Sequence, residues 1–390
     1  MLLTSAGATA VSFSPGPLGL CRDVSERIVC SREPAEAAEE LLHLLARRRF
    51  AWVILSDEVL LEALLAGGNA AALSGWFPFD PADRRVTDLL LSKHAFAERL
   101  KGLHIAIPAS RFASSARQAL AAAREFGYPV VVKGDRGFGG LEVRVAFDAR
   151  DLQRAARELL RRYSRVLVQH FVAGARVSAC ALFARGELTA FKAYRAECAY
   201  PDERSASTEH AFFAHEALEP ALRALGAATG FHGMAGVDFM YDHEHDALYA
   251  IEINPRPTIG FGGTAADREF FSPAIGRLLR GEQVTATAIY DGRERTQTYF
   301  PGHLFYLATN ARSWNPQSAG RAVACLREAR VQEWRLAIWE IARFFYDEAR
   351  SRFPPARAIF SRVRRSAVVA PLATQVRDDV RIAPRESLVG

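Results

Sequence analysis

Residues 251–257 read Ile-Glu-Ile-Asn-Pro-Arg-Pro, and this heptapeptide decides how the rest of the chain is interpreted. Its isoleucines alternate with Glu252 and Asn254, which predicts the end of a strand with both oxygen-bearing side chains on one face. The prolines end that strand and flank Arg256. Carboxylate and amide oxygens bind a hard divalent cation, and a guanidinium binds phosphate oxygens. The heptapeptide therefore indicates a Mg²⁺–phosphate site, with a buried strand that ends in surface polar groups as the alternative.

A partner strand precedes this segment, because residues 234–254 place apolar, alternating runs on both sides of a polar turn. That pattern is typical of a β-hairpin. If the turn centres on His245, Asp238 faces Glu252. Two carboxylates at opposing positions repel each other, and a bound cation resolves the repulsion. A solvated polar turn explains His243 and His245 without a transition-metal site.

Composition is that of a soluble globular protein, with 49% hydrophobic and 24% charged residues. The 390 residues are enough for two or three domains with their own cores. No hydrophobic run reaches the length of a membrane span, and the N-terminus lacks the basic region of a signal peptide. The five cysteines are scattered and form no CxxC pair, which is typical of reduced thiols rather than of a disulfide framework or a zinc site. We therefore expect a cytoplasmic protein.

Positive charge is carried almost entirely by arginine. The net charge of +6 requires nucleic acid to be considered as a partner, but arginine-rich usage also follows from genome composition. We expect no nucleic-acid partner. Lysine occurs only at positions 93, 101, 133 and 192. Each lysine that the chain retains is therefore a candidate for a specific role.

The first two of three predicted regions carry the α/β pattern. Residues 1–88 are predicted to form an N-terminal α/β domain that includes a buried strand at 50–55. Residues 89–282 hold a denser succession of helices and strands. Their boundary falls near a helix predicted at 88–101. The polar, turn-rich segment 199–209 is predicted to be a mobile loop and a plausible lid.

The third region, residues 283–390, is predicted to be basic and mainly helical, with a poorly ordered tail. Between 312 and 365 lie twelve Arg, five acidic residues and no Lys, with aromatic residues interleaved. A helical cap with a solvated arginine face is the favoured interpretation. Peripheral contact with a membrane, or with nucleic acid, through this basic segment is the less favoured alternative.

A glycine-rich loop follows Lys133, which ends the apolar strand 128–133. Gly137, Gly139 and Gly140 would let backbone N–H groups approach a phosphate without obstruction by a Cβ atom. The loop is neither a P-loop nor a dinucleotide-binding fingerprint, because a strand rather than a helix follows it. Glycine is common in hairpin turns, and a strand-end lysine is commonly solvated, so the loop alone does not establish a nucleotide site.

Taken in order along the chain, these motifs resemble the ATP-grasp superfamily. The nearest type looks like the carboxylate–amine ligases related to the large chain of carbamoyl-phosphate synthase. The motifs lie at 91–93, 102–108, 128–133 with its glycine loop, 168–174, 236–239 and 252–256. Each motif is loose alone, and their order gives the specificity. The resemblance implies an ATP-grasp fold of the α/β (α+β) class, with a nucleotide between two antiparallel sheets. An α/β domain would precede it and a helical extension would follow it.

The same resemblance implies how ATP is held. Lys93 and Lys133 would contact the α- and β-phosphates, and the glycine loop 137–140 would close over them. Gln169 would take the adenine amino group, at a position where many members carry Glu. Val172 would offer backbone groups to the adenine.

The resemblance also implies a metal centre. Asp238, Glu252 and Asn254 would hold one or two Mg²⁺ ions, for which Mn²⁺ is a substitute. Arg256 would touch the transferring phosphate and, with Lys133, would be catalytic. One departure from the family pattern is Arg176, which replaces a frequent acidic residue and puts ribose contacts in doubt. A second departure is the N-terminal domain, where a clear first strand with its glycine turn is not visible.

The implied reaction is an ADP-forming ligation. A small carboxylate, for example that of an amino acid, attacks the γ-phosphate to give an acylphosphate, and a small amine then displaces phosphate to form an amide. Lys192, Arg195 and Arg204 are candidates to bind the substrate carboxylate or the acylphosphate. The alternatives are an ATP-grasp kinase or carboxylase, and a non-catalytic ATP-binding protein associated with membranes. A homodimer is compatible with each of these.

Overall fold

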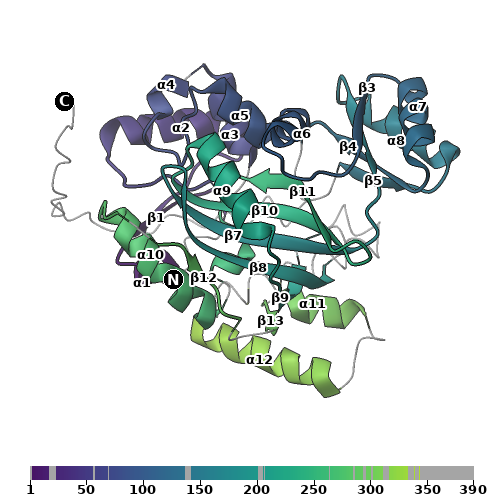
Figure 1. The fold of residues 1–390 in the computed structure, drawn as a ribbon. Coiled ribbons are helices and arrows are strands. Elements are labelled where there is room, and N and C mark those ends of the chain that lie inside the picture. Colours follow the sequence, from purple (N-terminus) through teal and green to yellow (C-terminus); the bar gives the residue numbers. More distant parts are fainter. Residues whose placement is uncertain are drawn as a thin grey trace, which may run out of the picture. The chain divides into compact units, whose positions relative to one another are not determined.

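The fold is taken from a computed structural model of the chain, shown in Figure 1. It describes residues 2–16, 23–55, 58–68, 70–136, 142–200, 205, 207–262, 264–283, 286–292, 296–299, 302–310, 316–332, 338 and 342. The chain divides into two compact units, Met1–Glu340 and Ile341–Gly390, and every element named below lies in the first. Within the described residues, no helix combines the length and the apolarity that crossing a membrane requires.

The N-terminal region is a small α/β unit in which two short strands pair in parallel. Its elements are α1 (Leu2–Ser5), β1 (Ala10–Phe13), β2 (Val24–Ile28), α2 (Pro34–Arg47), α3 (Glu58–Ala66), α4 (Ala70–Leu73) and α5 (Arg84–Leu91). Helix α2 begins at a proline, whose fixed φ and missing N–H suit the first turn. Its Leu41 and Leu45 are buried on the face that packs into the core.

The buried strand predicted at 50–55 is wrong in type, and only Leu55 of the segment is buried, while Ala51 is exposed and the other residues are partly buried. Residues 52–55 carry no strand assignment, and the Val53 N–H donates to the carbonyl oxygen of Trp76 (2.9 Å). Val53 and Leu55 pack into one hydrophobic core, while Trp52 and Ile54 pack into another. The apolar residues 52–55 are therefore explained by an extended segment between two hydrophobic cores. This segment does not pair with another strand in a sheet.

The single helix predicted at 88–101 is also wrong, because the chain breaks at Ser92. This residue has extended angles (φ −111°, ψ 121°), and its hydroxyl accepts a hydrogen bond from the Ala95 N–H (3.2 Å). It thus caps a second helix, α6 (Lys93–Gly102), and satisfies one of its free N–H groups. The break has a consequence for the site, since it puts Lys93 at the first position of α6.

The smaller of two large sheets is antiparallel and has the order β3-β6-β4-β5. Its strands are β3 (Ser110–Ala113), β4 (Val130–Gly134), β5 (Val143–Ala146) and β6 (Val166–His170). Helices α7 (Ala116–Phe126) and α8 (Ala149–Leu159) share a hydrophobic core with it. The hairpin predicted around the glycine loop is present, with Lys133 opposite Val143. Gly137, Gly139 and Gly140 lie outside the described residues.

The larger sheet has the order β11-β10-β7-β8-β9-β13, with β12 beside β8, and is antiparallel except at β12. Its strands are β7 (Ala175–Ala184), β8 (Glu187–Ala199), β9 (Ser207–Phe212), β10 (Gly233–Asp242), β11 (Ala247–Asn254), β12 (Ala288–Ile289) and β13 (Thr296–Thr298). Helix α9 (Leu218–Thr229) and the N-terminal helices share a core with one face of the sheet. The turn η2 (Ile259–Phe261) and α10 (Ala265–Leu279) contribute to the core on the other face.

Strand β7 shows how the sequence divides those two faces. Val177, Ala179 and Ala181 belong to the core shared with α9, and Cys180 and Leu182 belong to the core shared with α10. Alternate residues of a strand point to opposite faces, so every second side chain enters the same layer. The strand pairings of the smaller and the larger sheet confirm the prediction of two antiparallel sheets.

Two boundaries differ from the predicted ones. Ser207–Phe212 forms β9, so the polar segment 199–209 contains strand residues at both ends, and Glu209 is buried. Strands β12 and β13 lie beyond residue 282 and complete the larger sheet. The expected helices begin only after them, as α11 (Gly302–Thr309) and α12 (Pro316–Gln332). Most of the arginine-rich segment 312–365 lies outside the described residues.

Gly174 lies where the chain passes from β6 in one sheet to β7 in the other. A Cβ atom at this position would lie 1.9 Å from the carbonyl oxygen of Tyr241, which belongs to the backbone and cannot rotate away. We expect Gly174→Ala to lower the free energy of unfolding by ~2 kcal/mol, seen as a lower urea midpoint. Gly102→Ala is the matched control, because nothing lies within 4 Å of the added Cβ. Equal midpoints for the two variants would contradict the expectation.

Candidate functional site

The carboxylate pair predicted from the hairpin is present. Asp238 on β10 lies directly opposite Glu252 on β11. The turn itself is centred differently from the prediction, because Asp242 pairs with Ala247 at its base. A β-bulge between these two points absorbs Ile251 and restores the predicted pairing of the carboxylates.

A chain of hydrogen bonds fixes the polar side chains around this pair. The hydroxyl of Ser178 on β7 donates to Asp238 Oδ1, and Asn254 Nδ2 donates to Asp238 Oδ2 (3.2 Å). Arg256 Nη2 in turn donates to Asn254 Oδ1 (3.3 Å). The four residues are therefore held as one unit at the end of the larger sheet.

An acidic residue from the N-terminal region joins this unit. Arg256 Nε donates to Glu58 Oε1 on α3 at 3.0 Å, and both side chains are mostly buried. Glu58 also interacts electrostatically with Glu252 and raises its pKa. The carboxylates of Asp238, Glu252 and Glu58 thus lie close to one another, and that of Glu58 forms an ion pair with Arg256.

Lys133 and Lys93 bring positive charge to the carboxylates from the other side. Burial lowers the pKa of Lys133 to about 8, against the opposing effect of Glu252. Burial raises the pKa of Glu252, against the opposing effect of Lys93. Lys133 also interacts electrostatically with Lys93 and Asp238. Lys93 and Glu252 line one pocket, and Lys133 on β4 is close enough to interact with both of them.

Asp135 fixes the position of Lys93 relative to the smaller sheet. Its carbonyl oxygen accepts from the Lys93 N–H (2.9 Å), and its carboxylate accepts from the Ser92 hydroxyl (2.9 Å) and the His94 N–H (3.0 Å). A carboxylate at the first turn of a helix also interacts favourably with the helix dipole. The start of α6 is thereby bonded to the residue that follows β4.

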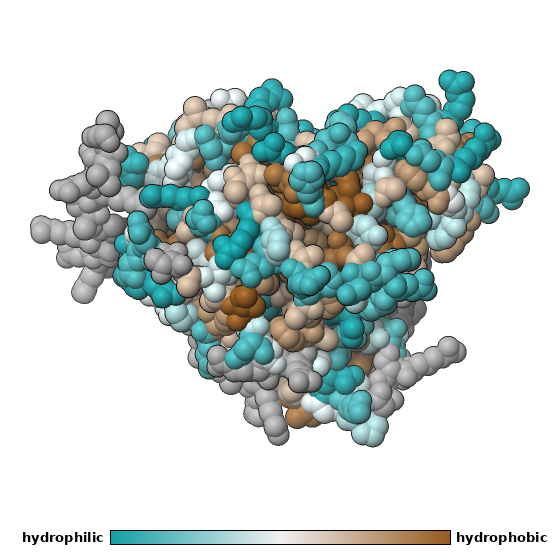
Figure 2. Space-filling model, viewed as in Figure 1, coloured by the Kyte–Doolittle hydropathy of each residue, from teal (hydrophilic) through white to brown (hydrophobic). Residues whose placement is uncertain are grey.

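A pocket of about 410 Å³ opens beside these groups. Glu252, Lys93 and Glu58 contribute polar groups to its lining, and Phe96 and Ile251 contribute apolar ones. Figure 2 shows apolar side chains gathered between the positions where Figure 1 labels α6 and β11, with hydrophilic side chains around them. The volume lies in the range of small-molecule sites, which combine an apolar lining with a few polar groups.

The two residues assigned to the adenine lie at the end of β6. Gln169 and Val172 are both buried. Gln169 Nε2 donates to the hydroxyl of Ser110 (3.0 Å), which itself donates to the carbonyl oxygen of Pro108 (2.7 Å). These two hydrogen bonds fix the orientation of the Gln169 amide group. Because its nitrogen donates to Ser110, its oxygen Oε1 points the other way and can accept a hydrogen bond.

The three candidates for substrate binding are placed differently. Lys192 is 2% exposed, and its ammonium bonds to Asp267 on α10 and to Gln297 on β13. Its charge is therefore already paired inside the protein. Arg195 is 40% exposed and forms an ion pair with Glu197 (2.7 Å). Arg204 lies outside the described residues.

Sequence reasoning missed Glu58, Ser178 and Ser110. Each of them contacts a predicted residue from a strand or helix far away in the chain. Ser178 could be found only from the register of β7 against β10, which a single sequence does not contain. Glu58 carries a weak signal, since it is an acidic residue in the first turn of the helix α3.

Comparison with known proteins agrees with this geometry. Residues 91–260 match the family model of the ATP-grasp domain. The C-terminal section of the carbamoyl phosphate synthase large chain from Methanopyrus kandleri is 28% identical over 192 residues, which cover 45% of this chain and 34% of that protein. The chain thus spans about a third of the length of that relative.

Solved structures share the fold. The biotin carboxylase domain of 2-oxoglutarate carboxylase from Hydrogenobacter thermophilus has a TM-score of 0.59 and 17% identity, and covers 74% of this chain and 68% of its own. N5-carboxyaminoimidazole synthetase from Staphylococcus aureus has a TM-score of 0.58 and 17% identity, with 74% and 75% covered. The family match, the two antiparallel sheets and the ordered motifs agree, and residues 91–260 of this chain have the ATP-grasp fold.

Proposed function

We propose that this chain is an ATP- and Mg²⁺-dependent ligase. It activates a small carboxylate as an acylphosphate and joins it to a small amine, giving ADP and phosphate. The observation that carries the proposal is the cross-strand pair of Asp238 and Glu252, surrounded by Lys93, Lys133 and Arg256. Two facing carboxylates with cationic groups around them suit a metal–triphosphate complex, in which both signs of charge are neutralised.

The donor atoms fit Mg²⁺. Asp238 and Glu252 offer carboxylate oxygens on one face of the hairpin, and Asn254 offers an amide oxygen beside them. Mg²⁺ and Mn²⁺ both accept such oxygen ligands. When bound, the ion would neutralise charge on the phosphoryl oxygens. Arg256, hydrogen-bonded to Asn254 Oδ1, is held next to the metal ligands, where its guanidinium can contact the transferring phosphoryl group.

The remaining residues would bind and orient ATP. Gln169 Oε1 would accept from the adenine amino group, and Val172 would offer its backbone to the ring. The two lysines would contact the α- and β-phosphates. Such fixed charges act by positioning and by electrostatic stabilisation, since phosphoryl transfer requires little covalent chemistry from the protein. Exclusion of water protects an acylphosphate from hydrolysis, and the buried setting of Lys133 and Asn254 supports this.

We prefer ligation because five of the six sequence relatives are carbamoyl phosphate synthase large chains. The sixth is an acetyl-CoA carboxylase, which keeps a carboxylase as an alternative. A small-molecule kinase or carboxylase is the second candidate. A non-catalytic ATP-binding role is disfavoured because Asp238, Glu252 and Asn254 are all retained.

We also propose a division of labour among three regions. Residues 1–88 would supply Glu58 to the site, residues 89–282 would bind ATP, and residues 283–390 would complete the larger sheet through β12 and β13 before the helices begin. The contact between Glu58 and Arg256 supports the first assignment. Arg204 is the proposed ligand for the substrate carboxylate, whereas Arg195 follows Tyr194 in β8 and therefore points to the face opposite the carboxylate pair. The buried pairing of Lys192 supports a positioning role for that residue.

Glu58 provides a test of the first assignment. We expect Glu58→Ala to lower kcat about tenfold, equivalent to ~1.4 kcal/mol, because Arg256 loses the carboxylate that fixes its guanidinium. Affinity for ATP should change less than kcat, since the adenine and the lysines are untouched. Glu39→Ala is the control, because Glu39 is an exposed glutamate on α2 of the same N-terminal region. Equal rates for the two variants would remove Glu58 from the site.

The reaction itself is tested by a screen of paired substrates. Purified full-length protein is incubated with MgATP and pairs of small carboxylates and amines, and phosphate and ADP are measured in parallel. Phosphate and ADP released together only when both substrates are present, with a condensed product in mass spectrometry, support ligation. ADP without phosphate identifies a kinase, and bicarbonate-dependent turnover identifies a carboxylase. Absence of ADP with every pair, despite ATP binding, rejects the enzymatic proposal.

A further inference from the structure

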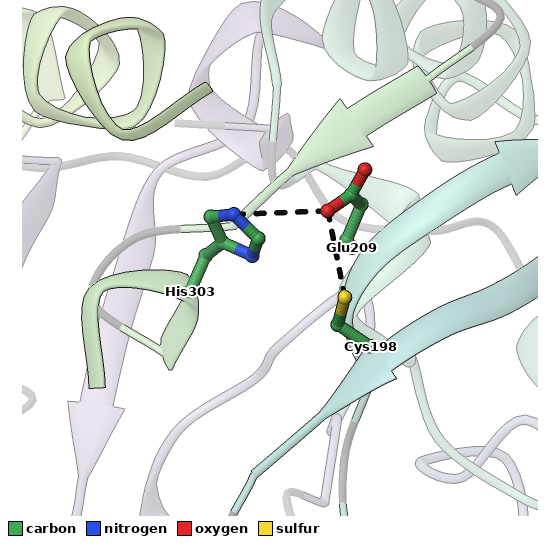
Figure 3. Close-up of side chains that lie close together, drawn as sticks. All are labelled: Cys198, Glu209 and His303. Atoms are coloured by element: carbon green, nitrogen blue, oxygen red, sulfur yellow. Dashed lines mark hydrogen bonds and ion pairs between the residues drawn. The ribbon is translucent and has the colours of Figure 1, made fainter. Parts of the chain in front are cut away.

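A second cluster of metal-binding residues lies away from the carboxylate hairpin. Cys198 on β8, Glu209 on β9 and His303 on α11 place one ligand atom each within 4.8 Å of one another (Figure 3). Glu209 Oε2 lies 3.5 Å from Cys198 Sγ and 3.7 Å from His303 Nε2. Cys198 and Glu209 are cross-strand partners at a β-bulge, so the backbone itself holds their side chains together.

The histidine is buried without an evident partner. The side chain of His303 is 1% exposed, and neither ring nitrogen has a hydrogen-bond partner among the described residues. The great majority of buried polar side-chain atoms have a hydrogen-bond partner. A buried imidazole without a hydrogen bond therefore requires an explanation. Figure 3 shows its ring directed at the carboxylate of Glu209.

The carboxylate is held in a suitable orientation by a further residue. Arg321 Nε on α12 lies 3.0 Å from Glu209 Oε1, which leaves Oε2 as the oxygen nearest the other two side chains. Carboxylates that bind metals are commonly fixed in this manner through their second oxygen. One negative charge on Glu209 and one on a Cys198 thiolate would balance a divalent cation.

We propose that Cys198, Glu209 and His303 form a binding site for a transition-metal cation of the Zn²⁺ class. Thiolate, imidazole and carboxylate are the ligands of Zn²⁺, whereas Mg²⁺ prefers oxygen alone. Bond lengths of about 2.0–2.3 Å at a tetrahedral ion place its ligand atoms roughly 3.2–3.8 Å apart. The two measured separations from Glu209 Oε2 fall in this range, and a fourth coordination position remains for water or another ligand.

The site is structural and separate from phosphoryl transfer. His210, next to Glu209 in β9, stacks on Tyr194, whose phenol is hydrogen-bonded to Ser178 beside Asp238. Neighbouring residues of a strand point to opposite faces, so the zinc ligands lie on the face away from the carboxylate pair. The ion would fasten α11 to β8 and β9 of the larger sheet. The expectation that the cysteines bind no zinc rested on missing CxxC spacing, but these ligands come from three separate elements.

The test is metal analysis of the full-length protein purified without chelators. We expect inductively coupled plasma mass spectrometry to find zinc in a stoichiometric amount, and Cys198→Ser and His303→Gln to lose it. Cys30→Ser is the control, because Cys30 is also a buried free thiol and lies in the N-terminal region. Replacement by Co²⁺ should produce thiolate-to-cobalt absorption in the near ultraviolet, and a chelator should lower the melting temperature of wild type but not of Cys198→Ser.

Two results would overturn the proposal. One is wild-type protein that takes up neither zinc nor cobalt when titrated with the metal alone. The other is bound zinc that persists in all site variants, which would locate it elsewhere. If Cys198→Ser and His303→Gln fail to fold, Glu209→Gln and the cobalt spectrum of wild type decide the question. The readouts involve no ATP, so failure of this proposal is independent of the proposed ligase activity.

Discussion

Glu252→Gln abolishes ATP consumption and leaves the fold intact, if the carboxylate pair holds Mg²⁺. The substitution preserves the shape of the side chain and removes the charge that faces Asp238. Loss of one metal ligand is expected to lower turnover by at least ~100-fold, since even residues that only support a ligand change activity 10–100-fold. Turnover is followed as ADP formation with a fixed carboxylate and amine pair from the substrate screen.

Stability provides the second measurement for this variant. Burial raises the pKa of Glu252, so its charge is costly in the unliganded protein, and Asp238 adds repulsion. We therefore expect the melting temperature of Glu252→Gln to equal or exceed that of wild type without metal. Glu244→Gln, in the exposed turn of the same hairpin, is the control and should keep full activity. Unchanged turnover in Glu252→Gln would reject the metal assignment.

Lys133→Met is expected to weaken MgATP binding and turnover by about 100-fold in kcat/KM, equivalent to ~2.7 kcal/mol. The lysine is buried and interacts with both carboxylates of the hairpin, so its ammonium faces the region assigned to the phosphates. Methionine keeps most of the side-chain volume and removes the charge. Lys101→Met is the matched control, because Lys101 is exposed and pairs with Glu98 on the same helix (2.7 Å).

The same lysine predicts how binding depends on pH. Its pKa is lowered to about 8, so the ammonium is present below pH 8 and is lost as the pH rises above that value. Bound phosphates favour the charged form, so nucleotide affinity is constant below about pH 8 and declines above it. Lys133→Arg should extend the constant range, because a guanidinium stays protonated. Calorimetric titration across pH 7 to 10 measures this, and a flat wild-type profile would contradict it.

The carboxylate hairpin could be predicted from sequence because its two strands are adjacent in the chain. Alternation gave the face of Glu252 and Asn254. The pairing of Glu252 with Asp238 was predicted correctly only because the bulge at Ile251 offsets a one-residue error in the predicted register of the turn. The same reasoning failed for residues 50–55, where burial against two cores imitates a strand, and for 88–101, where one serine ends a helix inside an apolar pattern.

Contacts between distant segments could not be predicted. Glu58 and Arg256 are separated by 198 residues, and Cys198, Glu209 and His303 by up to 105, so neither periodicity nor motif spacing relates them. Lys192, a predicted substrate ligand, lies in β8, and its partner Asp267 lies on α10. A lysine that is rare in the sequence therefore proved to be paired inside the protein, with its charge already neutralised.

The bulge at Ile251 has a consequence for changes of length in this hairpin. The turn at 243–246, continued as a regular ladder, would place Ile251 opposite Asp238 and turn Glu252 toward the apolar face. One surplus residue in β11 corrects this. A hairpin that lacked Ile251 altogether would therefore bring the same two acids together without a bulge. Deletion of one residue from a strand ordinarily turns the following side chains to the opposite face, yet here the hairpin with Ile251 and the hairpin without it bring the same two acids together. Homologous hairpins that differ by one residue at this point can thus conserve the same chemistry.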